Sequence, residues 1–463
     1  MNIAIAMILS IGVKAIAAVL EVVTQATITN GVGVSEYGDY SFFVSLIEGG
    51  YYVLFSGSIK INTYYLSSPE SSLLNFKKKY VTRYVMPIIA LIILTFAVMQ
   101  NPYGILAGII LGIYYMAYDN ISVFYARGKQ LPAMLGEYLF GRIVLLIGVM
   151  GAIHIDVATG LVLFALYGLQ FAVMMLWFLP HKRKLNKGTS EVDVPLKKLT
   201  EYQISDVANS LIVYSPTILQ YIVGGSFTAG FMGIITIVKR FINFISGPTS
   251  KIFLPEFSKL YKSGETEKLQ QSYVMIVRIQ MVFIGTVGAI LIGFPYLFLK
   301  MFSPDLIQYT AVFTLTAICI MVVSGIGPVT GLLQMTGNEH ICNRNQYISI
   351  GAMIATWLIL LHKSVLFGLY GMCVQIVVEG ALKYYSVCKW FGHNIVPVKN
   401  YILLWLPVGA LKAVVSLCGL EQSIAALIIG TGCVFIWNAA FALRDPLIAE
   451  LVNEKVISKI KKS

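Results

Sequence analysis

The sequence predicts an all-α polytopic membrane protein that crosses a lipid bilayer about fourteen times. Of its 463 residues, 57% are hydrophobic and only 12% are charged, whereas a globular domain carries about 25% charged residues. Apolar stretches of about 20 residues, the length that spans a bilayer, recur from the first residues nearly to the C-terminus. The connections between them are too short for a soluble domain, which excludes an ordinary soluble enzyme.

Polar and Pro/Gly clusters divide the apolar runs into the expected spans. These spans are 4–29, 38–66, 82–100, 103–125, 132–153, 158–180, 202–224, 228–254, 273–297, 308–334, 343–361, 366–390, 400–418 and 423–443.

The orientation follows from the Lys and Arg residues in alternate connections and at the span ends beside them. One set of connections holds 24 of the 34 cations and the opposite set only two, Lys300 and Lys363. The excess of cations marks the cytoplasmic side, so both termini are expected there. This distribution also explains the net charge of +12 by topology and contact with anionic lipid, without a nucleic-acid partner.

Cysteine and histidine usage indicates no metal centre. The six cysteines all lie in the second half of the chain, and none forms a CxxC pair. We expect no disulfide framework, no zinc site and no cofactor.

A weak internal repeat links the two halves of the chain. The stretch 35–60 aligns with 227–252, so that Gly38 matches Gly230, and each stretch opens the second of six spans. Repeats of this kind are a known device of transporters, and this one suggests two equivalent bundles.

Eight cations fall inside the expected spans, where an ionisable side chain costs roughly 2.5–3.5 kcal/mol on insertion scales. They are Lys14, Lys60, Arg142, Lys239, Arg240, Lys251, Lys383 and Lys412. The acidic candidates at membrane depth are Glu21, Glu48, Asp119, Glu137, Asp206 and Glu379.

Helical spacing gathers many of these groups into polar stripes on the first, second, seventh and eighth spans, which suggests a shared aqueous cavity. The stripes comprise Ser10, Lys14, Glu21 and Gln25; Ser41, Ser45, Glu48, Tyr52 and Ser56, with Lys60 at the edge; Tyr202, Asp206, Asn209 and Gln220; and Arg240, Phe244, Gly247 and Lys251.

A cationic cavity suits an anionic ligand such as a diphosphate, because Arg offers a planar fork and Lys a mobile point charge. The candidate substrate-binding residues are therefore Lys14, Lys60, Lys239, Arg240 and Lys251, and the candidates for ion coupling are Glu21, Glu48 and Asp206. A structural interpretation stays open beside this one. Long cationic side chains near a cytoplasmic end can snorkel, and Lys14 can pair with Glu21 and Arg142 with Glu137.

Several segments resemble the polysaccharide flippases of the O-antigen (Wzx-type) family. The segment GVGVSEYGDYSFFVSL at 31–46 is similar to that family's Gly…Glu-Tyr-Gly signature between the first two spans. Looser similarities follow in order at 255–273, 301–318, 331–350 and 367–385.

The resemblance implies membership of the multidrug/oligosaccharidyl-lipid/polysaccharide (MOP) exporter superfamily, with two six-helix lobes around a central cavity and two additional C-terminal helices. On this chain the lobes would be residues 1–184 and 200–391, joined by a basic linker at 185–199 and followed by the two helices and basic tail at 392–463. It further implies alternating access that moves an undecaprenyl-diphosphate-linked oligosaccharide to the periplasmic leaflet. Its partners would be that substrate, membrane lipid, and a polysaccharide polymerase with its chain-length regulator.

Other functions remain open. A lipid II flippase fits the same physics, and a drug exporter of the same superfamily would have the same fold but a net acidic cavity. A membrane polymerase or ligase of the polysaccharide pathway would need a larger outside loop than the connection at 298–307. We find no GxSxG, P-loop or HExxH motif, so the sequence favours a transporter over an enzyme.

Overall fold

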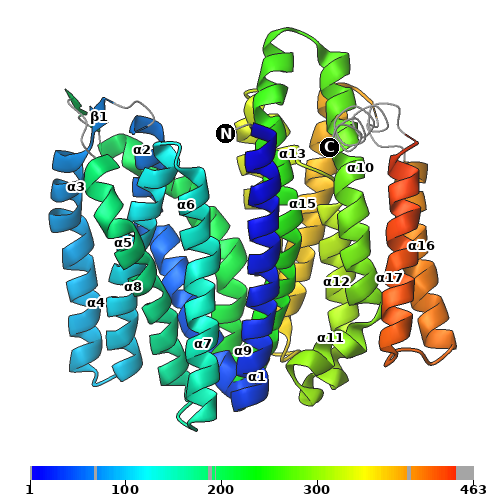
Figure 1. Ribbon diagram of the computed structural model, residues 1–463. Coiled ribbons are helices and arrows are strands. Elements are labelled where there is room, and N and C mark those ends of the chain that lie inside the picture. The colour runs from blue at the N-terminus through cyan, green and yellow to red at the C-terminus, as the bar shows by residue number, and fades with distance from the viewer. Residues whose placement is uncertain are drawn as a thin grey trace, which may run out of the picture. The chain divides into compact units, whose positions relative to one another are not determined.

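The computed structural model describes residues 3–66, 70–185, 190–192, 194, 196–393 and 398–444. The described chain is almost wholly helical and includes nine segments long and apolar enough to cross a membrane (Figure 1). This confirms the expected fold class, an all-α polytopic membrane protein. The described residues pack as two compact units: those up to Ile237 with Trp357–Leu369 form the first unit, and the others form the second. The lobe boundaries expected at 184 and 200 remain a prediction.

The first unit contains all elements of the N-terminal half. They are α1 (Ile3–Leu54), α2 (Ser56–Tyr65), β1 (Ser71–Ser72), α3 (Leu74–Tyr80), η1 (Val81–Val85), α4 (Met86–Val98), α5 (Pro102–Ala126), α6 (Gln130–Met134), η2 (Leu135–Phe140), α7 (Gly141–His154), α8 (Gly160–Leu185), β2 (Ser190–Glu191) and the first part of α9 (Leu196–Lys262). The two short strands pair in parallel, Ser71 with Ser190 and Ser72 with Glu191, and so attach the start of the basic linker to the chain before α3.

The second unit contains the rest of α9 and the elements that follow. They are α10 (Thr266–Gly288), η3 (Ala289–Gly293), α11 (Pro295–Phe302), η4 (Pro304–Tyr309), α12 (Thr310–Ser324), α13 (Val329–Met335), α17 (Ile424–Ala442), α16 (Val398–Leu417) and most of α14 (Glu339–Leu360) and α15 (Phe367–Phe391). Its buried core is built around Phe257, Leu269, Tyr273 and Ile276.

Each of the fourteen expected spans coincides with helix, but two expected connections differ from the prediction. The segment 30–37 is helical apart from Gly33, so α1 runs over 52 residues. At 1.5 Å per residue a straight helix of that length would measure about 78 Å, more than twice the roughly 30 Å of hydrocarbon. The chain therefore crosses twice, turning at Gly33, whose φ of 87° and ψ of 166° are open almost only to glycine. The connection at 298–307 also proves to be largely helical, within α11 and η4.

The internal repeat has a structural counterpart inside the first unit. Gly225 bends α9 with φ 80° and ψ 176°, close to the values at Gly33, and each of these glycines lies two residues before its aligned stretch. The aligned pair Gly38 and Gly230 marks a close crossing of the two helices. A Cβ added at Gly38 would lie 1.7 Å from the Ser226 carbonyl oxygen, and one added at Gly230 would lie 2.3 Å from the Val34 oxygen. This reciprocal contact supports the interpretation of the two stretches as structural equivalents.

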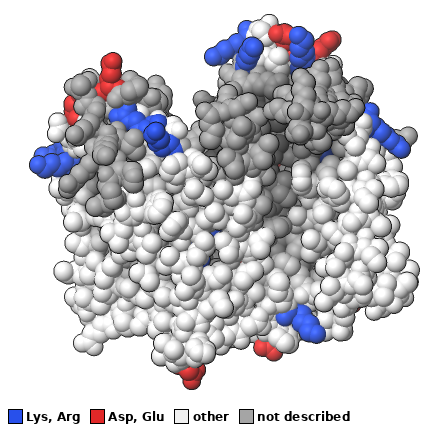
Figure 2. Space-filling model, in the orientation of Figure 1, with Lys and Arg blue, Asp and Glu red and all other residues white. Residues whose placement is uncertain are grey.

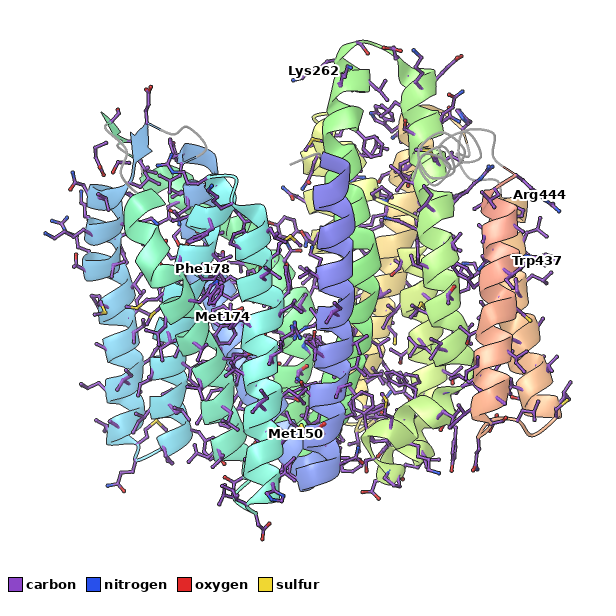
Figure 3. All side chains as sticks on the ribbon, viewed as in Figure 1. Met150, Met174, Phe178, Lys262, Trp437 and Arg444 are labelled. Carbon is purple, nitrogen blue, oxygen red and sulfur yellow. The ribbon has the colours of Figure 1, made fainter. Side chains whose placement is uncertain are left out.

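Apolar side chains cover the outer surface, as a lipid environment requires. On the face shown in Figure 2, exposed charged residues gather at the two ends of the helices and leave an almost uncharged band between them. Among the exposed apolar residues, Leu91 and Val98 of α4 are 67% and 79% exposed. Met174 and Phe178 of α8 instead point into the first unit and are almost fully buried (Figure 3).

Candidate functional site

Two of the acidic residues expected at membrane depth lie beside α7 and η2. Glu21 is buried, and its Oε2 lies 2.7 Å from Nη1 of Arg142. Glu137 in turn accepts a hydrogen bond of 2.6 Å from the Tyr125 hydroxyl. Helix packing thus brings Glu21 of the first span to Arg142, and the pairing of Arg142 with Glu137, left open by the sequence, stays a prediction.

Lys14 lies on the same helix as Glu21, but its ammonium lies over an aromatic ring. Its Nζ is 5.2 Å from the centroid of the Tyr138 ring, within the range of a cation–π interaction. Tyr138 belongs to η2, a π-helical turn, and such turns often re-aim side chains at functional sites. The first unit thus stabilises this cation at membrane depth with a ring face.

Lys60 and Asp206, both singled out from the sequence, are brought together by α2 and α9. Lys60 Nζ lies 2.8 Å from Asp206 Oδ1, and the side chains are 38% and 13% exposed. Since the lysine is partly open to solvent, the pair stabilises the fold only modestly and can exchange its partner at low cost. Glu48, the third candidate for ion coupling, accepts a 2.9 Å hydrogen bond from the Tyr167 hydroxyl.

Sequence reasoning missed a polar network that ties α2, α3 and α5 together. Lys77, which the orientation count placed in a loop, lies 3.0 Å from Oδ1 of the buried Asp119. Asn62 donates to the same oxygen at 2.7 Å and to Ser122 Oγ at 2.7 Å. A buried carboxylate supplied with this many donors is structural in character, because every group gains a partner.

In the second unit Lys239 lines a cavity with residues of α12 and α15. The cavity measures about 180 Å³, and Gln375, Glu379 and Lys383 of α15 form one wall. These three residues recur at intervals of four, so they share a helix face, and that spacing was visible in the sequence. Sequence reasoning placed Glu379 and Lys383 inside a span but did not assign them to the site.

The other candidates on α9 are described in part. The side chain of Arg240 is half-buried, next to Lys239. The side chains of Phe244, Gly247 and Lys251 lie outside the described residues, so the stripe from Arg240 to Lys251 stays a prediction. Lys14 and Lys60 belong to the first unit, and Lys239 and Arg240 to the second.

These side chains are better suited to binding an anion than to catalysing a reaction. Cations at membrane depth are held by carboxylates and a ring face, each of which an incoming anion can replace or supplement. Among the described residues, no group of three or more His, Cys, Asp or Glu side chains is arranged to hold a metal ion.

Comparison with known proteins finds similarity at the level of structure alone. No family model and no curated sequence matches the chain. Among solved structures, the lipid II flippase MurJ in an inward closed conformation is similar with a TM-score of 0.69 and 12% identity, over 95% of this chain and 100% of that one.

Two further structures extend the likeness to exporters. A multidrug resistance transporter of the MATE family, in an inward-facing conformation, has a TM-score of 0.53 and 13% identity over 88% of this chain and 95% of its own. A MOP-superfamily transporter from Pyrococcus furiosus, described by the reverse polarity of its binding pocket, has a TM-score of 0.50 and 12% identity over 84% and 94%.

The chain therefore has the fold of the MOP-superfamily transporters. These three structures are those of a flippase and two transporters. The chain is a multi-pass membrane protein with the architecture that includes lipid II flippases and MATE exporters.

Proposed function

We propose that this protein is a flippase that moves undecaprenyl-diphosphate-linked oligosaccharide repeat units from the cytoplasmic to the periplasmic leaflet of a bacterial inner membrane. The observation that carries the proposal is the similarity in fold, over almost the whole chain, to a flippase whose substrate is lipid II, combined with cations at membrane depth. A diphosphate cannot cross hydrocarbon without such partners, because burying its charge unpaired is prohibitive. The sequence resemblance to O-antigen flippases favours a polysaccharide repeat unit as the sugar part.

The contacts suggest how the headgroup would be held. Lys60 exchanges its contact with Asp206 for a phosphate oxygen, and Lys14 adds a second charge from its place over Tyr138. Lys239, Arg240 and Lys251 of α9 belong to the second unit and would offer positive charge to an anion there. Exchange of one charge-assisted contact for another costs little, which lets the diphosphate enter and leave.

Ion coupling would use the carboxylates that these exchanges set free. Glu21, Glu48 and Asp206 each hold a partner of this chain in the structure, Arg142, Tyr167 and Lys60 respectively. A proton or metal cation that binds a released carboxylate would link substrate movement to an ion gradient.

The lipid II flippase remains the second candidate, and the similarity to MurJ is the observation that favours it. A drug exporter is less well supported, because a cationic drug would be repelled by the lysine and arginine side chains among the candidate binding residues.

A genetic experiment tests the pathway step and separates these candidates. Loss of a repeat-unit flippase should leave lipid-linked repeat units accumulating on the cytoplasmic face of the membrane, since polymerisation happens outside. Loss of a lipid II flippase should instead cause lysis with accumulation of lipid II. Unpolymerised repeat units that already lie in the outer leaflet of the deletion strain would contradict both and would indicate a polymerase.

A further inference from the structure

The cavity beside Lys239 has features that the general proposal does not explain. It is lined by residues of α9, α12 and α15 within the second unit, and its volume of about 180 Å³ is far more than one water molecule requires. Ser324 and Gly327 close its other side. Its lining carries two ammonium groups and one carboxylate, a net charge of +1.

The single carboxylate is already engaged. Glu379 Oε1 lies 2.6 Å from Lys383 Nζ, one helical turn along α15, and its Oε2 accepts from Gln375 Nε2. Lys239 has no hydrogen bond or ion pair with any described residue, although Glu379 attracts it through space across the cavity. An ammonium at membrane depth is costly without an acceptor, so this cavity is suited to an anion.

Gln375 supplies a second, independent observation. Its side chain is fully buried, and Nε2 also lies 3.3 Å from Ser349 Oγ, but Oε1 has no donor within the described part of the chain. Buried amide oxygens almost always accept a hydrogen bond, so this one needs a donor that the described residues do not provide. A ligand that suits this lining therefore offers both an acceptor to Lys239 and a donor to Gln375.

We propose that the cavity lined by Lys239, Gln375 and Lys383 binds one phosphate group together with a hydroxyl next to it. Inorganic phosphate carries both in one ion, and a diphosphate-linked sugar carries the hydroxyl on its first ring. Chloride and sulfate have acceptors only and leave Gln375 unsatisfied. This site is inferred from its lining residues alone. Under the proposed flippase function, it binds the phosphate headgroup of the substrate within the second unit.

Glu379 is a positioning residue in this site. It pairs with Lys383 and so fixes the position of that ammonium, and its negative charge opposes that of the phosphate. Neutralising it should therefore strengthen phosphate binding, whereas a purely structural ion pair would only lose stability.

Equilibrium binding of radiolabelled inorganic phosphate to the full-length protein in nanodiscs tests the site. Lys239→Gln should weaken binding about ten- to a hundredfold, the effect of one hydrogen bond to a charged group. Glu379→Gln should tighten binding about tenfold, because a like charge is removed. The matched control is Lys412→Gln, which removes a lysine of α16 that pairs with Glu421 at 3.3 Å and does not line the cavity, and it should bind as the parent does.

Competition assigns the source of the phosphate. A short-chain prenyl-diphosphate-linked monosaccharide that displaces phosphate identifies the lipid headgroup as the occupant, and failure to displace it identifies free phosphate. Sulfate that competes as well as phosphate, or wild-type binding by Lys239→Gln, would overturn the site. Unchanged lipid translocation by a protein without phosphate binding would refute this site alone, whereas phosphate binding without any translocation would refute the flippase function alone.

Discussion

The crossing at Gly38 and Gly230 makes the sharpest structural prediction, because an added methyl group at either position would meet backbone. In Gly38→Ala the new Cβ starts 1.7 Å from the Ser226 oxygen, so the helices must separate by at least about 1.3 Å to reach 3.0 Å. A carbonyl cannot rotate away as a side chain can. We therefore expect Gly38→Ala to lower the free energy of unfolding by an amount in the upper part of the range of about 1–3 kcal/mol that is typical of overpacking.

Gly50→Ala is the matched control on the same helical run. Nothing lies within 4 Å of the position where its Cβ would be, so the substitution should stabilise by about 0.5–1 kcal/mol through helix propensity. Thermal unfolding of the purified proteins in nanodiscs should thus show opposite shifts for Gly38→Ala and Gly50→Ala.

The double mutant refines the test. Gly230→Ala should also destabilise, because its Cβ would lie 2.3 Å from the Val34 oxygen. One separation of the helices relieves both clashes, so Gly38→Ala and Gly230→Ala together should cost less than the sum of the single effects. Unfolding temperatures for Gly38→Ala and Gly230→Ala that match Gly50→Ala would refute the close crossing.

Three further predictions concern charge. A double-mutant cycle of Lys60→Gln and Asp206→Asn should give a coupling of about 0.2–1 kcal/mol in unfolding, and zero coupling would contradict the 2.8 Å pair. The Arg240→Ala, Lys251→Ala double mutant should insert at normal abundance and lose transport, while Arg240→Lys should keep part of it because the charge remains; normal transport by the double mutant would remove these two residues from the site. A reporter fused to the C-terminus should report a cytoplasmic location, as the distribution of cations predicts, and an outside location would overturn the fourteen-span orientation.

Hydropathy was enough to predict the spans, because every one must be apolar over the bilayer thickness, and the alignment of Gly38 with Gly230 anticipated the helix crossing. The sequence predicted a connection near Gly33 but not its length. Nothing in the sequence distinguishes a loop of several residues from a turn made by a single glycine between two helices. Local patterns predict which groups share a helix face but not which helices meet.

The site illustrates that limit. Lys60 and Asp206 were both selected by spacing, yet their contact depends on the packing of segments that lie 146 residues apart. For the same reason the sequence could not predict that Glu21 contacts Arg142. The face of Gln375, Glu379 and Lys383 was visible as a repeat of four, but only the packing of α12 and α9 makes it the wall of a cavity.

The most direct test of the flippase function is translocation in proteoliposomes that contain the purified protein and a fluorescent undecaprenyl-diphosphate-linked oligosaccharide. A membrane-impermeant quencher or sugar oxidant then reports the fraction of headgroups exposed outside over time. The account predicts movement that depends on the protein and slows when Lys60→Ala or Lys239→Gln is reconstituted instead. Headgroups that stay in their original leaflet, with well-folded protein and an imposed ion gradient of either sign, would contradict it.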